Sequence, residues 1–157
     1  MISYKEGTYR FTYRVAGLVI HNSRALLHRL EADDFWALPG GRVELMENSY
    51  DAILREMKEE TGEKAKLIRL LWVVENFFAH EDLDYHEIGF YYLLMFPDTA
   101  PLLRLDEFDG IENGIRIIFK WFDLSKLQKT VLYPTFLRTK ICNLPLDIEH
   151  IVHVDKE

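Results

Sequence analysis

The feature of this chain that most constrains its fold is one well-bounded helical segment set among runs of strand-forming residues. From Ser49 to Thr61 apolar residues recur at helical spacing, Asn48 or Ser49 can cap the start, and Gly62 suits the end. Elsewhere the apolar runs are rich in aromatic and β-branched residues, and short polar turns separate them. This pattern predicts a mixed α/β domain built from hairpins and few helices, not a doubly wound parallel sheet.

Two β-hairpins are expected from the strand-forming runs. The first joins residues 11–20 to residues 25–30, and the second joins residues 66–78 to residues 86–96 across an acidic stretch. Residues 97–114 contain several prolines and glycines and are expected to form a loop. The remaining expected elements are a strand at residues 115–122, a short helix at 124–128, a longer helix at 134–143 with Pro134 in its first turn, and a last strand at 148–154.

Length and composition restrict the class of protein. The 157 residues suffice for one compact domain, so residues 1–157 are expected to form a single domain with one core. No run approaches the roughly 18 apolar residues of a membrane span, and residues 1–10 lack the apolar segment of a secretory signal. The single cysteine, Cys142, excludes an internal disulfide. These features predict a cytoplasmic protein with no membrane partner.

The net charge narrows the range of partners. A formal charge of −7 at pH 7 argues against binding to a nucleic-acid backbone, which requires a basic surface. A small polyanion remains compatible with this charge, because divalent cations can bridge it to protein carboxylates. The expected partner is therefore a small phosphate-bearing molecule.

The helix at Ser49–Thr61 carries the residues with the clearest chemistry. On a helical wheel the predicted buried stripe is about 100° wide and is formed by Tyr50, Ile53, Leu54, Met57 and Thr61. Glu56, Glu59 and Glu60 lie in the adjacent arc, where like charges repel by about a few tenths of a kcal/mol per pair. A divalent cation reverses this repulsion, because Mg²⁺ prefers carboxylate oxygens. The alternative is a solvated acidic face on which Arg55 and Glu59 form an ordinary i,i+4 ion pair.

The order of residues around this helix is that of a known signature. Gly41 is followed after five residues by Glu47, and after seven more by the run REMKEETG at residues 55–62. This arrangement resembles the Nudix box, and every charged and glycine position of that signature is present. The chain departs from it at Met46, where glycine is common, and at Glu63, where an aliphatic residue is usual. Neither departure removes a residue with a chemical role.

The resemblance implies an α+β fold, in which a mixed sheet lies between helices (an α/β/α sandwich) and the box forms a loop–helix–loop. It also implies a magnesium- or manganese-dependent hydrolase in which water attacks one phosphorus of a diphosphate. Glu56, Glu59 and Glu60 would hold Mg²⁺ or Mn²⁺, together with the backbone carbonyl of Gly41. Arg55 and Glu47 would pair and orient those carboxylates.

The resemblance leaves the general base and the substrate open. Some family members use a box glutamate as the base and others a carboxylate from a later loop, for which Glu112 is the preferred candidate here. The default substrate is a nucleoside triphosphate or another nucleoside diphosphate derivative. Arg42, Phe78 and His86 are candidate substrate contacts, although aromatic residues in strands usually belong to the core.

Two kinds of protein that resemble this family in fold have other functions, and both functions remain as alternatives. Isopentenyl diphosphate isomerase shares the fold but relies on a cysteine, and Cys142 lies far beyond the box in an expected packing helix. A non-catalytic nucleotide-sensing module commonly loses box glutamates, whereas this chain keeps them. A homodimer is also left open, because an exposed edge of the long hairpin can pair with a second copy.

Overall fold

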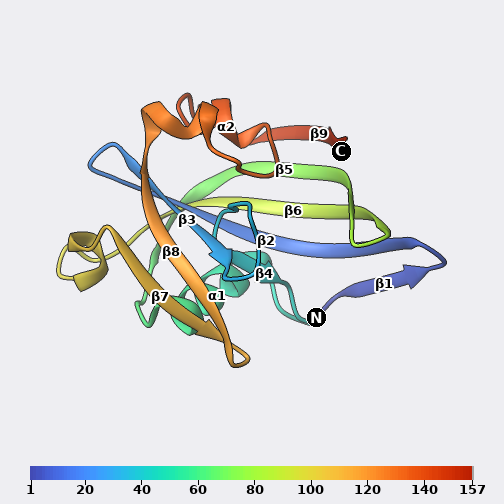
Figure 1. The fold of residues 1–157 in the computed structure, drawn as a ribbon, viewed down its shortest axis with the longest axis horizontal. Coiled ribbons are helices and arrows are strands. Elements are labelled where there is room, and N and C mark those ends of the chain that lie inside the picture. The colour runs from blue at the N-terminus through green and yellow to red at the C-terminus, as the bar shows by residue number, and fades with distance from the viewer. Residues whose placement is uncertain (157) are drawn as a thin grey trace.

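A computed structural model describes residues 1–156, except for the side chains of residues 111 and 112, and shows a nine-stranded mixed sheet with few helices (Figure 1). The main path through the sheet runs in the order β7-β8-β3-β2-β6-β5-β9, and β1 and β4 both pair with β2. The strands are β1 (Ser3–Glu6), β2 (Tyr9–His21), β3 (Arg24–Leu30), β4 (Gly40–Arg42), β5 (Lys66–His80), β6 (Leu83–Met95), β7 (Glu107–Glu112), β8 (Ile115–Asp123) and β9 (Glu149–Asp155). The helices are α1 (Ser49–Thr61) and α2 (Leu137–Lys140), with 3₁₀ turns η1 (Pro101–Arg104) and η2 (Leu124–Lys129).

Strand alternation divides the core between the two faces of the sheet. Successive side chains of a strand point to opposite faces, so Val15 and Val19 of β2 join one buried cluster while Ala16 and Leu18 join the other. The first cluster packs against α1 and the second against α2. Figure 1 shows α1 below the long strands and α2 above them. The sheet therefore lies between helical elements, as predicted.

Helix α1 begins and ends at the expected residues. The Asn48 side chain accepts a hydrogen bond of 2.9 Å from the Asp51 backbone N–H, which makes Asn48 the N-cap. Gly62 ends the helix at a φ of 79°, a left-handed conformation that glycine adopts without strain. Local sequence alone thus fixes this helix.

Both predicted hairpins form, and strands of the same chain flank most of the long one. Residues 72–78 of β5 pair with β9, and residues 84–94 of β6 pair in parallel with β2. A homodimer through the edge of this hairpin stays a prediction, and the part of β5 outside the β9 pairing is residues 66–71 and 79–80.

Two expectations outside the box are also wrong. Residues 97–114, expected to be a loop, contain η1 and β7. Strand β7 pairs with β8, and the rings of Phe108 and Phe119 stack at 5.0 Å. The helix expected at residues 134–143 is only Leu137–Lys140. Thr135 instead donates its hydroxyl to Asp155 of β9 at 2.5 Å, which holds this segment against the sheet.

The helices of the described residues are all too short or too polar to cross a membrane.

Candidate active site

Two of the three glutamates on the acidic face of α1, Glu56 and Glu60, are buried rather than solvated. Glu56 is 4% exposed and Glu60 is 3% exposed, whereas Tyr50, expected in the buried stripe, is 51% exposed. The wheel misplaced this stripe because two neighbours cover the acidic side of α1: the backbone around Gly41 of β4, and strand β7, which the sequence did not predict. A side chain on Gly110 of β7 would reach to 2.5 Å from the Glu60 carbonyl oxygen.

Gly41 brings the backbone directly against the Glu56 carboxylate. A Cβ at this position would lie 2.5 Å from Glu56 Oε1 and 2.7 Å from Oε2, closer than any real contact. Strand β4 holds Gly41 there by pairing it with Val15 of β2. A glycine is therefore needed at this position for space, and its peptide lies beside a buried carboxylate.

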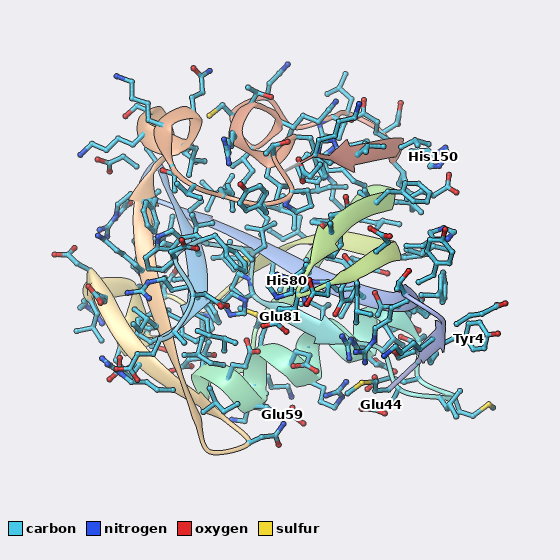
Figure 2. The ribbon with its side chains drawn as sticks, turned by 45° about the vertical axis from the view of Figure 1, so that its right-hand side comes forward. Tyr4, Glu44, Glu59, His80, Glu81 and His150 are labelled. Atoms are coloured by element: carbon cyan, nitrogen blue, oxygen red, sulfur yellow. The ribbon has the colours of Figure 1, made fainter. Side chains whose placement is uncertain are left out.

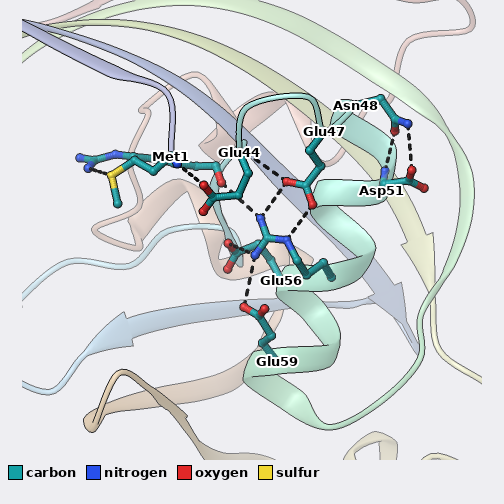
Figure 3. Close-up of polar contacts among 9 residues, drawn as sticks. Met1, Glu44, Glu47, Asn48, Asp51, Glu56 and Glu59 are labelled. Carbon is teal, nitrogen blue, oxygen red and sulfur yellow. Dashed lines mark hydrogen bonds and ion pairs between the residues drawn. The ribbon is translucent and has the colours of Figure 1, made fainter.

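Arg55 connects three of the predicted site glutamates (Figure 3). Its guanidinium donates to both oxygens of Glu47, at 2.7 and 2.9 Å, and to Glu56 Oε1 at 3.0 Å. A longer contact of 3.3 Å reaches Glu59. The hydrogen bonds that Arg55 donates to Glu47 raise the pKa of Arg55 and lower the pKa of Glu47, so both groups stay charged. This arrangement fixes the side chains of Glu47 and Glu56.

Glu60 lies on the other side of the cluster, next to a histidine that sequence reasoning missed. Its side chain is fully buried, and His28 Nδ1 of β3 lies 3.7 Å from its Oε2. Burial, assisted by the charge of Arg14, lowers the pKa of His28 to about 3, so the imidazole is neutral. The His28 ring packs against Phe119 at 5.5 Å. His28 therefore brings no positive charge to Glu60.

The predicted metal ligands are near one another but do not form a closed site. Among the described residues, no three His, Cys, Asp or Glu side chains are arranged closely enough to hold a metal ion. The Arg55 guanidinium lies between Glu56 and Glu59, and the Glu59 side chain is 53% exposed. Figure 2 shows Glu59 at the outer surface of α1. In this arrangement Arg55 provides positive charge to the Glu56 and Glu59 carboxylates.

A cavity of about 420 Å³ opens on the α2 face of the sheet. Phe78, a predicted substrate contact, lines it. His28 also lines it, and its Nδ1 lies 3.7 Å from Glu60 Oε2. His86 lies on the opposite face of β6 and stacks on Phe77 at 4.6 Å. Arg42 does not line the cavity but pairs across from Arg14, which does.

The segment of residues 97–114 contains Glu112, the predicted general base, and a second carboxylate, Asp109. Asp109 forms an ion pair of 2.9 Å with Arg116, and the side chain of Glu112 lies outside the described residues. The role of Glu112 as the general base therefore stays a prediction.

Sequence reasoning also missed two polar side chains of the cavity, Arg14 and Asn76, which both occur inside apolar strands. A polar residue at an inward position of a strand is the signal that identifies such a group.

Comparison with known proteins identifies the family. The NUDIX domain model matches residues 11–139, so the chain belongs to the NUDIX family, as predicted. The chain is 40% identical over 63 residues to a MutT-like protein of Streptomyces ambofaciens, covering 40% of this chain and 41% of that protein. It is 33% identical over 72 residues to an RNA pyrophosphohydrolase of Ruthia magnifica, covering 45% and 40% respectively.

Solved structures agree with the fold. A UDP-X diphosphatase superposes with a TM-score of 0.62 at 23% identity, covering 89% of this chain and 66% of that one. This likeness confirms the predicted α+β fold. The alignments with the curated relatives span less than half of those proteins' length, so the activities of those relatives enter only as support for a proposal.

Proposed function

We propose that this protein is a metal-dependent hydrolase that cleaves the diphosphate linkage of a nucleoside triphosphate or another nucleoside diphosphate derivative. The observation that carries the proposal is the pair of buried carboxylates one turn apart on α1, Glu56 and Glu60, the second of which lies 3.7 Å from the cavity-lining His28. Burying carboxylates is unfavourable unless a cation or hydrogen bonds compensate. NUDIX membership and the names of the relatives, which include an RNA pyrophosphohydrolase and a UDP-X diphosphatase, support the same reaction.

The residues around these carboxylates fit a hard divalent cation. Glu56, Glu59, Glu60 and the Gly41 carbonyl would supply only oxygen ligands, which suit Mg²⁺ or Mn²⁺. The Gly41 peptide already lies against the Glu56 carboxylate, with no room for a side chain between them. Held by these residues, such a cation would supply charge neutralisation for the diphosphate and a lowered pKa for a bound water.

The rest of the chain positions the reactants. Arg55, fixed by two hydrogen bonds to Glu47, holds Glu56 in place. The cavity beside His28 receives the substrate. A water oxygen then forms a bond to one phosphorus, the bridging P–O bond breaks, and its oxygen leaves with the other phosphate. A carboxylate takes the proton of the water, and Glu112 remains the candidate for this step.

A nucleotide panel in oxygen-18 water tests this proposal. With Mg²⁺ or Mn²⁺, at least one nucleoside triphosphate or diphosphate derivative is expected to give two phosphate-bearing products, one of which carries the heavy oxygen. With EDTA no product is expected. A panel in which no diphosphate compound is cleaved, or in which cleavage persists in EDTA, would sink the proposal.

Exchanging Arg55 for lysine tests the positioning network. Lysine keeps the charge but loses the two-pronged contact with Glu47. We expect Arg55→Lys to lower Mn²⁺ affinity by about 10- to 100-fold, the usual effect of losing a residue that orients ligands. Calorimetric titration with Mn²⁺ measures this, and Lys58→Arg, on the exposed side of the same helix, is the control. Unchanged affinity in Arg55→Lys would show that Arg55 orients no ligand.

A further inference from the structure

A row of buried polar side chains crosses three strands at the wall of the cavity. The strand register places Thr12 of β2 and Asn76 of β5 on either side of Glu87 of β6. The three residues are 0%, 3% and 9% exposed, respectively. Beyond Arg14 and Gly89, the positions on the same face are apolar, among them Ala16 and Tyr91. Because buried polar groups are costly, packing alone does not explain this row.

The contacts within the row leave hydrogen-bonding capacity toward the cavity. Thr12 donates its hydroxyl to Glu87 Oε2 at 3.0 Å, and a hydrogen bond from the Asn76 amide also reaches Glu87. Asn76 Oδ1 is buried and has no hydrogen-bond partner among the described residues. Asn76 and Glu87 both line the cavity. Two acceptor groups therefore stand side by side in its wall: Asn76 Oδ1, which lacks a donor among the described residues, and the Glu87 carboxylate, whose two oxygens can accept further hydrogen bonds.

Arg14 adds donors next to these acceptors. It lies across from Gly89, two positions along from Glu87, and lines the same cavity. Its guanidinium donates to the Leu38 carbonyl at 3.3 Å and acts electrostatically on Glu87. The wall thus presents the acceptors of Glu87 and Asn76 beside the donors of Arg14.

We infer that Arg14, Asn76 and Glu87 determine base specificity and select guanine. Guanine presents a carbonyl acceptor followed by two adjacent N–H donors, which match Arg14 and then the two acceptors. Adenine presents a ring acceptor where the second group must be a donor, and cytosine and uracil do not carry two adjacent donors. Phe78 and Tyr133, which also line the cavity, offer aromatic rings for stacking.

The inference rests on the proposed function, because it assigns the base of the same substrate. The cavity lining runs from Glu87 to His28, which lies 3.7 Å from Glu60. A base held at Glu87 therefore lies in the same cavity whose wall includes His28, the neighbour of Glu60. The cavity volume of about 420 Å³ falls within the range of nucleoside-sized ligand sites.

Calorimetric titration with nucleoside monophosphates in EDTA tests the inference. GMP is expected to bind at least about tenfold more tightly than AMP, with IMP between them because it lacks the 2-amino donor. Glu87→Gln replaces one acceptor with a donor and is expected to lower GMP affinity about tenfold or more while changing AMP affinity less than about threefold. Asp84→Asn is the matched control, because Asp84 is an exposed residue of the same strand and does not line this cavity.

A second variant decides the matter if Glu87→Gln does not fold. Arg14→Met removes the donor for the base carbonyl, so it is expected to lower GMP and IMP affinities by the same factor. Equal binding of GMP and AMP by the wild type, binding of neither, or an unchanged GMP preference in both variants overturns the inference. Because EDTA removes the metal and no turnover is measured, this result is independent of whether hydrolysis occurs.

Discussion

Replacing Glu60 with glutamine is expected to lower the turnover of any cleaved nucleotide by on the order of 10³-fold, the scale of losing one group that stabilises charge at the reacting centre. Glu60 has the best-protected carboxylate of the cluster, with a fully buried side chain beside neutral His28. Glutamine keeps the size of the side chain and removes its charge. Steady-state hydrolysis with Mg²⁺ measures the effect.

Glu63→Gln is the matched control for this experiment. It removes the same charge just past the end of α1, from a half-buried position with no role in the site. Its turnover is expected to match that of the wild type, and its melting temperature should do the same. Wild-type turnover in Glu60→Gln would remove Glu60 from the mechanism.

Alanine substitutions at two adjacent glycines are expected to affect different properties: the one at Gly41 lowers activity, and the one at Gly40 lowers stability. At Gly41 the added methyl group meets the Glu56 carboxylate, the end of a flexible side chain that can move away. Gly41→Ala is therefore expected to fold but to lower activity by on the order of 10²-fold, because the displaced Glu56 no longer lies in place.

At Gly40 the methyl group meets backbone instead. It collides with the Val15 carbonyl oxygen and lies 2.9 Å from Ala16 Cα, and neither atom can move without breaking strand pairing. Gly40→Ala is expected to lower the free energy of unfolding by about 3 kcal/mol. For a chain of this size the melting temperature then falls by about 6–12 °C. Thermal melts of both variants check the contrast, and equal destabilisation of the two would contradict it.

The sequence predicted the catalytic helix well because its signals are local. The cap at Asn48, the stop at Gly62 and the spacing of the box glutamates all act within a few residues. The first hairpin was predicted for the same reason, since its turn separates two runs of strand formers. Such features do not depend on the rest of the fold.

The errors came from contacts between distant parts of the chain. The wheel assigned Tyr50 to the buried side and Glu60 to its margin, because it took no account of β7 covering α1. Strand β7 was missed because Asp109 and Gly110 are typical turn residues, whereas Gly110 is needed here for close approach to α1. The helix and strand propensities of a sequence do not show which elements pack against each other, as β7 does against α1.

The row of polar residues in the sheet was not predicted, for a related reason. Asn76 and Glu87 are far apart in the sequence from the box, and each by itself is an isolated polar residue in a strand. Only the register of β5, β6 and β2 places them with Thr12 in one row. The family could therefore be predicted from the spacing of the box, but the row of polar residues in the sheet could be seen only from the strand register.

Mn²⁺ titration of the wild type and of the double variant Glu56→Gln/Glu60→Gln tests most directly whether the buried carboxylates of α1 hold the metal. Calorimetry is expected to show a saturable Mn²⁺ site in the wild type and none in the double variant, with Glu63→Gln behaving as the wild type. Mn²⁺ binding of wild-type strength in a folded double variant would place the metal elsewhere and contradict the account.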